Sequence, residues 1–447
     1  MAGRLGRCSI VGRGRRRCDR ASSPPRRWTD NARLSDLDAP VTDPADLLAL
    51  GQRYYLPIYR QRELVLERGE GARVWDSTGR DYVDLAAGIA VNAFGHCDPG
   101  LVAALTEQAQ RLWHVSNVFH SEPPLRLAAE LVEASGFAAR VFLCNSGAEA
   151  NEAAIKLARR HAAARGRGPE RRTILTFRGS FHGRTLATVT ATAQPKYQEG
   201  YEPLPGGFRY VDFNDAEAAE AAFAGDDVCA VLVEPIQGEG GVMPAAQGFL
   251  GHLRTLCDRH GALLMFDEIQ AGMGRTGRLF AHQWDGVRPD VVTLAKALGA
   301  GFPIGAMLVG EAAAETLGFG AHGTTFGGNP LAAAVARVVL CRLREQSLLD
   351  NVGARGDQLR TALECLAAET GVIATVRGRG LMLGAVLADA WRGRAGELLD
   401  RAAAEGLLIL QAGPDVLRFV PPLNIDEATL AEGLARLGRA LRAARAA

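Results

Sequence analysis

The chain has 447 residues, 47% of them hydrophobic and 6% aromatic, a composition typical of a soluble globular protein of about two domains. Its net charge of +1 is uneven: residues 1–34 carry 10 Arg and 2 Asp, a net +8, which leaves −7 for the rest and argues against a nucleic-acid surface on the folded part. No apolar run approaches the ~18 residues of a membrane span, and the 8 cysteines form no CxxC pair and no cluster with histidine. We therefore expect a reducing, cytoplasmic environment and no structural metal.

The first 40 residues are rich in Arg, Gly, Ser and Pro and lack apolar periodicity, so we expect residues 1–45 to form a disordered basic tail. An organellar presequence, a nucleic-acid-binding arm and an upstream extension from a misplaced start codon are the three interpretations. We favour the extension, because the stretch lacks a clear amphipathic helix.

The segment from about Asp46 to Leu66 predicts a short helix and an extended arm. A hairpin is expected next, with strands over residues 72–75 and 82–85 around an Asp-Ser-Thr-Gly turn. Helices are expected over residues 99–112 and 124–135.

Short apolar runs alternate with helical patterns from residue 140 to residue 310. We expect strands over Arg140–Cys144, Thr173–Phe177, Ala230–Val233, Leu263–Phe266, Val291–Leu294 and Ala306–Val309. This alternation predicts an α/β fold with a mostly parallel sheet covered on both faces. The last third changes to an α+β pattern, with helices over 331–344, 352–369 and 394–405 and strand-turn units over 372–386 and 407–420, which indicates a smaller second domain.

Two of the loops that follow these strands have the composition of a ligand site. A glycine turn, Ser146-Gly147, opens a helix and directs free backbone N–H groups at one point, which suits a phosphate; a capping box of Ser146 and Glu149 explains the same residues without a ligand. Phe181 and Arg184 follow the next strand, where they could cover a planar cofactor and hold a carboxylate, or could be a core residue and a solvated charge.

A lysine and an aspartate end two further strands. The chain holds only 3 lysines against 48 arginines, and Lys296 lies just past the strand 291–294. Asp267 ends the strand 263–266. An amine can form a Schiff base and a carboxylate can hold a pyridinium proton, so the pair indicates pyridoxal 5'-phosphate (PLP), although each residue alone has a structural explanation.

With these residues in place, the chain from about Leu50 to Arg442 resembles the class III aminotransferases of PLP fold type I, and within them the N-acetylornithine aminotransferases. The likeness rests on separated motifs that include NSGAEANEAAIKLAR, SFHGRT, EPIQGEGG, FDEIQAGMGRTG, LAKALGAGFPIGAM and HGTTFGGNPLA. The resemblance implies a mostly parallel seven-stranded sheet in a large PLP-binding domain, residues 96–328, and a smaller α+β C-terminal domain, residues 329–447. Residues 46–95 would form an arm and hairpin that pack with the small domain.

The resemblance also implies how the cofactor is held. Lys296 is similar to the lysine that bonds to the aldehyde and moves protons, and Asp267 to the partner of the ring nitrogen. Gln270 would contact the ring oxygen, and Phe181 would stack on the ring. The phosphate cup would be formed by Ser146, Gly147 and Ala148 together with Thr325 of a neighbouring subunit, which makes a homodimer with shared active sites the expected assembly.

Substrate recognition is implied at four further positions. Arg184 would hold the distant carboxylate of N-acetylornithine, and Thr324 would lie near the substrate. Arg418 would bind the α-carboxylate of glutamate or 2-oxoglutarate, with Glu239 pairing to Arg418 when that carboxylate is absent. The expected reaction converts N-acetylornithine and 2-oxoglutarate to N-acetylglutamate 5-semialdehyde and glutamate, a step of arginine biosynthesis.

Other functions remain open from the sequence. An N-succinylornithine aminotransferase of arginine catabolism has overlapping motifs, and an aminotransferase for ornithine or other omega-amino acids is a further alternative. A PLP-binding regulator would have no need of the substrate residues, and a nicotinamide dehydrogenase is excluded because no glycine fingerprint opens a helix after a strand.

Overall fold

The computed structural model describes residues 43–446, which fall into two compact units whose boundary in the sequence lies between Val65 and Leu66. The described part of the first unit contains one helix, α1 (Pro44–Tyr54), whose N-cap Asp43 accepts a hydrogen bond from the backbone of Ala45 at 2.9 Å. The basic tail predicted over residues 1–45 lies almost wholly outside the described residues. No helix within 43–446 is long and apolar enough to cross a membrane.

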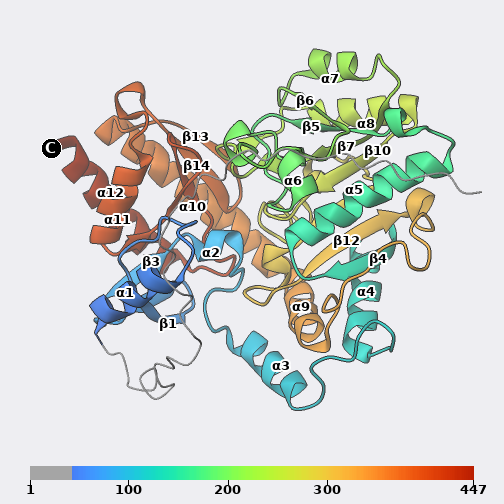
Figure 1. The fold of residues 1–447 in the computed structure, drawn as a ribbon. Helices are drawn as coiled ribbons and strands as arrows, with labels where there is room; N and C mark the ends of the chain where they lie inside the picture. Colours follow the sequence, from blue (N-terminus) through green and yellow to red (C-terminus); the bar gives the residue numbers. More distant parts are fainter. Residues whose placement is uncertain (1–42, 447) are drawn as a thin grey trace, which may run out of the picture. The chain divides into compact units, whose positions relative to one another are not determined.

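The largest sheet of the second unit has seven strands, in the order β4-β12-β11-β10-β7-β5-β6 (Figure 1). Its strands are β4 (Ala138–Cys144), β5 (Thr173–Phe177), β6 (Phe208–Val211), β7 (Val228–Val233), β10 (Leu263–Asp267), β11 (Val291–Leu294) and β12 (Gly305–Gly310). Only β12 runs against its neighbours, so the prediction of a mostly parallel sheet is confirmed. The other six strands bring their carboxyl ends to one edge, where open α/β sheets bind ligands.

Helices cover both faces of this sheet because its central strands are apolar on both sides. Leu264 and Phe266 share a core cluster with residues of α8 (Phe249–His260), whereas the alternate residues Leu263 and Met265 pack in a second cluster with α5 (Gly147–Ala164). The remaining helices of this region are α2 (Ala87–Ala90), α3 (Pro99–Ala109), α4 (Glu122–Ser135), α6 (Leu186–Ala191) and α7 (Ala216–Ala222), and a two-stranded ribbon joins β8 (Ile236–Gln237) to β9 (Met243–Pro244).

The C-terminal part has the expected α+β character. Its four-stranded sheet has the order β13-β14-β17-β16, with β13 (Ile373–Arg379), β14 (Met382–Leu387), β16 (Leu410–Gln411) and β17 (Val416–Phe419), and its helices are α9 (Pro330–Leu343), α10 (Gln346–Thr370), α11 (Ala395–Ala404) and α12 (Glu427–Ala446). The predicted hairpin consists of β2 (Arg73–Asp76) and β3 (Asp81–Asp84), preceded by β1 (Leu66–Glu70). In the same sheet, β3 pairs in parallel with β15 (Leu407–Leu408), so the hairpin joins a C-terminal strand.

Several elements differ from the expectations. α10 begins at Gln346 and not at Val352, six residues earlier, and the sequence analysis assigned none of α6, α7, β6 and α12. The missed helix α12 buries Leu430, Leu434, Leu437 and Leu441, a 3.6-residue periodicity that predicts an amphipathic helix. The four half-buried residues of β6, by contrast, have no such pattern, and the strand is defined by its pairing with β5.

Candidate active site

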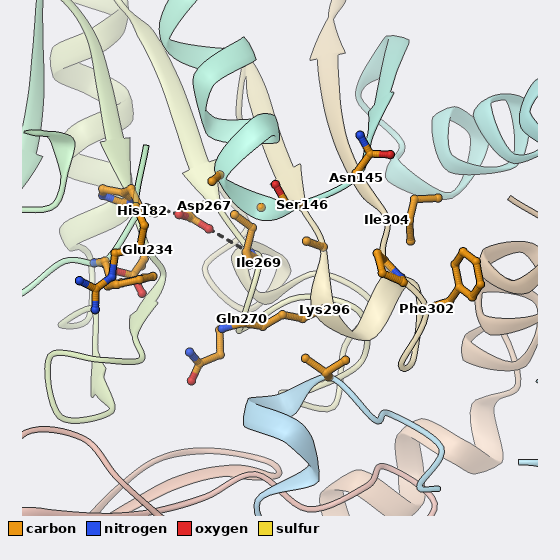
Figure 2. A pocket seen from close by; sticks show the side chains of 18 of the residues that line it. Asn145, Ser146, His182, Glu234, Asp267, Ile269, Gln270, Lys296, Phe302 and Ile304 are labelled. Atoms are coloured by element: carbon orange, nitrogen blue, oxygen red, sulfur yellow. Dashed lines mark hydrogen bonds and ion pairs between the residues drawn. The ribbon is translucent and has the colours of Figure 1, made fainter. Parts of the chain in front are cut away.

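A cavity of about 410 Å³ lies at the carboxyl edge of the large sheet (Figure 2). The loops that follow β4, β5, β7, β10 and β11 all contribute to its wall. Most of the predicted site residues line it, namely Ser146, Gly147, Ala148, Phe181, Arg184, Asp267, Gln270 and Lys296. The parallel strands thus bring together side chains that are up to 150 positions apart in the sequence, from Ser146 to Lys296.

Lys296 lies two residues after the end of β11 and has a left-handed backbone, with φ of +44°. Its amine has neither a hydrogen-bond nor an ion-pair partner among residues 43–446. Burial lowers the pKa of Lys296 below its ordinary value, and the positive charge of Arg418 lowers it further. A depressed pKa increases the neutral fraction of the amine, which is the form that attacks an aldehyde.

Asp267 is buried at the end of β10, with three hydrogen-bond donors around its carboxylate. Oδ2 accepts hydrogen bonds from Asn151 Nδ2 and from His182 Nδ1, each at 2.8 Å, and Oδ1 accepts one from the backbone of Ile269 at 3.1 Å. The donors come from α5, from the loop after β5 and from the loop after β10, so the carboxylate is held from three sides.

The N-terminus of α5 faces the same cavity. Ser146 is its N-cap, and its Oγ accepts a hydrogen bond from the backbone of Glu149 at 3.2 Å. The Glu149 carboxylate accepts a hydrogen bond from the backbone of Asn145 at 2.5 Å, so the expected capping box closes one residue earlier than the N-cap. A Cβ atom on Gly147 would lie 2.7 Å from Ile269 Cδ1. A larger residue would push the Ile269 side chain aside, so glycine lets the turn pack this closely at a helix N-terminus whose N–H groups can bind an anion.

Phe181 and Arg184 lie on the loop between β5 and α6. The backbone N–H of Phe181 donates to Glu234 Oε1 at 2.8 Å, and its ring meets Tyr197 edge to face at 5.8 Å. Arg184 is exposed, and its guanidinium lies 4.0 Å from the centroid of the Tyr197 ring. It has no carboxylate partner within residues 43–446 and is therefore free to bind one.

Arg418 reaches the site from β17. It is 3% exposed, forms an ion pair with Glu239 and donates to Gln270 Oε1 at 3.2 Å, while its Nε has no partner in the described part of the chain. Gln270 lines the cavity, so the pair of Arg418 and Glu239 lies one side chain away from the cavity wall.

Thr324 and Thr325 do not line this cavity. They line a neighbouring hollow of about 500 Å³, and Thr324 Oγ1 accepts a hydrogen bond from Asn145 Nδ2 at 3.0 Å. A position beside the site, and not in it, is what a residue that serves another subunit would have. The assembly itself stays a prediction.

Three buried polar residues at the site were not identified from the sequence. Asn151 and His182 hold Asp267, and Glu234 accepts hydrogen bonds from the backbones of Phe181 and Gly238. Burial raises the pKa of Glu234 to about 7. A polar residue among the alanines of the buried face of α5 was a usable signal for Asn151. Glu234 directly follows the buried strand β7, which is the same signal that identified Asp267. Nothing local distinguished His182.

The residues present fit PLP on the evidence of the chain itself. A buried carboxylate with a fixed orientation, an unpartnered amine of lowered pKa and a helix N-terminus with a glycine where a Cβ atom would clash are the three features that the ring nitrogen, aldehyde and phosphate of that cofactor need. On a mostly parallel seven-stranded sheet, they define a PLP-dependent enzyme of fold type I.

The chain belongs to the family described as Aminotransferase class-III, whose model matches residues 55–441. It is 69% identical over 390 residues to the acetylornithine aminotransferase of Xanthomonas campestris pv. campestris, which covers 87% of this chain and 96% of the relative. It is 53% identical over 389 residues to a succinylornithine transaminase/acetylornithine aminotransferase of Pseudomonas aeruginosa, covering 87% of this chain and 95% of the relative. The crystal structure of N-acetylornithine aminotransferase from Stenotrophomonas maltophilia K279a superposes with a TM-score of 0.80 at 58% identity, covering 89% of this chain and 99% of that one. The chain is an aminotransferase, and its cofactor is PLP.

Proposed function

We propose that this enzyme transfers the terminal amino group of N-acetylornithine to 2-oxoglutarate, giving N-acetylglutamate 5-semialdehyde and glutamate, in arginine biosynthesis. The observation that carries the proposal is the ion pair of Arg418 and Glu239 at the cavity edge. A site that accepts two substrates in turn, one with a carboxylate beside the reacting carbon and one without, needs a cation that can be exposed or neutralised. The similarity to acetylornithine aminotransferases supports this choice of substrate.

When bound, PLP supplies an aldehyde that takes up an amino group and a conjugated ring that withdraws electrons from the substrate carbon. In our proposal Lys296 would hold the cofactor through that aldehyde, and its amine would carry the proton of the reacting carbon. Asp267 keeps the ring nitrogen protonated, Gln270 donates to the ring oxygen, and Phe181 covers one face of the ring. The backbone at the N-terminus of α5, with Ser146, Gly147 and Ala148, holds the phosphate.

The arginines divide the work of substrate binding. Arg184 is exposed and unpaired with any described carboxylate, so it can hold the carboxylate that lies at the far end of N-acetylornithine. Arg418 stays neutralised by Glu239 while that substrate is bound. With glutamate or 2-oxoglutarate, the α-carboxylate competes for Arg418, and Glu239 moves aside.

We also propose that the enzyme is a homodimer in which Thr325 of one copy completes the phosphate site of the other and Thr324 lies near the substrate. The hollow that these threonines line next to the cavity supports this arrangement, as do the exposed side chains of Trp113, Val118 and Phe119. Sedimentation should give about twice the chain mass of 47.5 kDa. A stable, active monomer would disprove the shared site.

A second candidate function is favoured by one relative. The P. aeruginosa protein has a name that covers both succinylornithine and acetylornithine, and the two acyl groups differ only at a position remote from the reacting amine. The test compares kcat/KM for N-acetylornithine, N-succinylornithine and ornithine with 2-oxoglutarate as acceptor. We expect N-acetylornithine to be preferred. A tenfold preference for the succinyl compound would reverse the assignment, and turnover of none of the three would refute the proposed function.

A further inference from the structure

The Asn151 side chain connects four elements of the site, although neither the mechanism above nor the sequence motifs give it a role. It is fully buried on α5, four residues after Gly147. Its Oδ1 accepts a hydrogen bond from Thr293 Oγ1 of β11 at 2.8 Å. Its Nδ2 donates to Asp267 Oδ2 at the end of β10 and to the carbonyl oxygen of His182 after β5, each at 2.8 Å.

This carboxamide can adopt only one orientation. Both N–H groups of Asn151 point at acceptors that cannot donate, a carboxylate and a backbone carbonyl. If the amide were flipped, its oxygen would face these two oxygens at hydrogen-bond distance, which is repulsive. The Thr293 hydroxyl must then be the donor to Oδ1. All three polar positions of the side chain are used, and no rotation preserves them.

The arrangement leaves Asp267 with an asymmetric carboxylate. Oδ2 accepts from both Asn151 and His182, whereas Oδ1 accepts only the backbone N–H of Ile269 at 3.1 Å. A carboxylate oxygen has room for a second strong donor, so Oδ1 is the oxygen with capacity for the ring nitrogen of the cofactor. Loss of the bond from Asn151 would free the carboxylate to rotate about its Cβ–Cγ bond.

We infer that Asn151 is a positioning residue that sets the separation between the phosphate-binding N-terminus of α5 and the Asp267 carboxylate, and thus between the sites for the two ends of PLP. The inference rests on the roles proposed above for Ser146 to Ala148 and for Asp267. Asn151 lies about one helical turn from the N-terminus of α5, so a side chain of fixed geometry there transmits the position of the helix directly to Asp267. Thr293 acts through Asn151 by fixing its amide.

Variants at Thr293 separate this role from a contribution to folding alone. Thr293→Val removes the hydroxyl but keeps the shape, and Thr293→Ser restores the hydroxyl. Thr176 offers a matched control because it is also a fully buried strand threonine, but its Oγ1 has no hydrogen-bond partner among the described residues. Thr176→Val should therefore leave the cofactor site unchanged.

Asn151→Asp has nearly the same shape as the parent but cannot donate two hydrogen bonds, and it places a second carboxylate against Asp267 Oδ2. Two carboxylates at this distance share a proton, which weakens the hold of Asp267 on the ring nitrogen. This variant tests the inference by charge, whereas the Thr293 variants test it by orientation.

The measurement is the rate at which holoenzyme loses PLP on dilution, followed in the visible absorption of the bound cofactor without any amino substrate. We expect about tenfold faster loss and a displaced absorption maximum for Asn151→Asp, a severalfold faster loss for Thr293→Val, and parent behaviour for Thr293→Ser and Thr176→Val. Parent-like PLP loss and spectrum in both Asn151→Asp and Thr293→Val would overturn the inference. Because no substrate is used, that result would leave the proposed reaction untouched, and failure to turn over N-acetylornithine would leave this inference untouched.

Discussion

At the scale of single residues, the properties that suit Lys296 to its proposed role do not contribute to the stability of the folded state. Its side chain is partly buried, its amine has no partner in the described part of the chain, and the backbone at this position lies in the left-handed region, φ +44°. None of these properties stabilises the fold. The first two predictions concern this lysine and the ion pair beside it.

Replacing Lys296 with Met should raise the free energy of unfolding of the cofactor-free protein by roughly 1–3 kcal/mol near neutral pH, because a thioether of similar length needs no hydration. The folded pKa of Lys296 lies below its ordinary value of 10.5, so the unfolded chain binds more protons between the two values, and the stability of the parent rises with pH in that window. The advantage of Lys296→Met should therefore shrink from pH 7 towards pH 10 in urea unfolding. An advantage that grows with pH would contradict the sign of the shift.

Replacing Glu239 with Gln should damage the two half-reactions unequally. Without the carboxylate, the positive charge of Arg418 is not neutralised by a partner when N-acetylornithine binds, so the half-reaction with this substrate should slow. The half-reaction with glutamate, which needs a free Arg418, should be spared or faster. Loss of one partner from a largely buried pair is enough to change the ratio of the two rates by about tenfold. Stopped-flow absorbance of the bound cofactor measures each half-reaction separately, and equal losses would exclude the gating role of Glu239.

At the scale of elements, the N-terminus of α5 combines a structural and a ligand-binding task. Ser146 caps the helix through the backbone of Glu149, and the same turn lines the cavity. The capping explanation and the phosphate explanation that the sequence left open are therefore compatible. A capped helix end still has N–H groups to offer.

Ser146→Ala should lower the free energy of unfolding by about 1 kcal/mol, the usual value of an N-cap, and should also speed the loss of PLP. The matched control is Asp215→Ala, which removes the N-cap of α7, where the carboxylate accepts from Ala218 at 2.8 Å. It should cost similar stability and leave PLP binding unchanged. Guanidinium unfolding and cofactor release by dilution give the two quantities, and equal PLP loss in both variants would mean that Ser146 acts only through stability.

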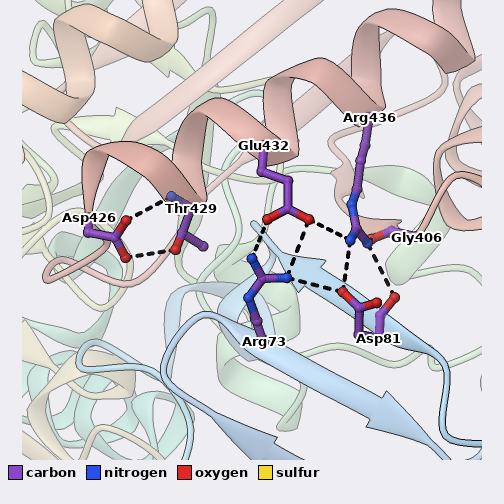
Figure 3. Close-up of polar contacts among 7 residues, drawn as sticks. All are labelled: Arg73, Asp81, Gly406, Asp426, Thr429, Glu432 and Arg436. Carbon is purple, nitrogen blue, oxygen red and sulfur yellow. Dashed lines mark hydrogen bonds and ion pairs between the residues drawn. The ribbon is translucent and has the colours of Figure 1, made fainter.

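At the scale of the whole molecule, a network of charges fastens the N-terminal hairpin to the last helix (Figure 3). Arg436 of α12 donates to Asp81 at 2.8 Å and to Glu432 at 2.6 Å, and Arg73 of β2 pairs with Glu432 and, at 3.1 Å, with Asp81. The hydrogen bond from Arg73 lowers the pKa of Glu432. Two arginines and two carboxylates, one of each from either end of the second unit's sequence, thus form a single network of ion pairs.

Glu432→Gln should lower the free energy of unfolding by about 1 kcal/mol at neutral pH and low salt, because each arginine loses one anionic partner. A group with a lowered pKa contributes stability above its ordinary pKa of 4.5, and that stability is lost as the pH falls, so parent and variant should converge in acid. Glu369→Gln, which breaks the exposed pair with Arg442, is the control and should cause no measurable change. Activity should be unaffected in both. A Glu432→Gln effect that persists at low pH would point to packing and not to charge.

The sequence by itself determined the elements and the chemistry that depend on neighbours in the chain. The predicted bounds of the strands 173–177 and 291–294 agree with the structure at both ends. Runs of β-branched and apolar side chains bounded by polar residues or glycine are patterns of neighbouring residues, so they can be recognised in the sequence alone. Asp267 and Lys296 were found for the same reason, since a polar group that ends a buried parallel strand lies at the ligand edge of a sheet. The ion pair of Arg418 and Glu239 came only from resemblance to a family, since 179 positions separate the two residues.

Only the tertiary structure decided which side chains complete the site. Asn151 donates to a carboxylate 116 positions away and His182 to the same carboxylate across 85 positions, and no local pattern of either residue names Asp267 as its partner. The pairing of β3 with β15 and the reversal of β12 within the parallel sheet were likewise invisible, as was the separation of Thr324 and Thr325 from the main cavity. The physical reason is common to all of them. Local sequence sets the backbone conformation and the polarity of each segment, but hydrogen-bond partners across elements are selected when the segments pack, because a buried polar group must find its partner wherever the fold provides one.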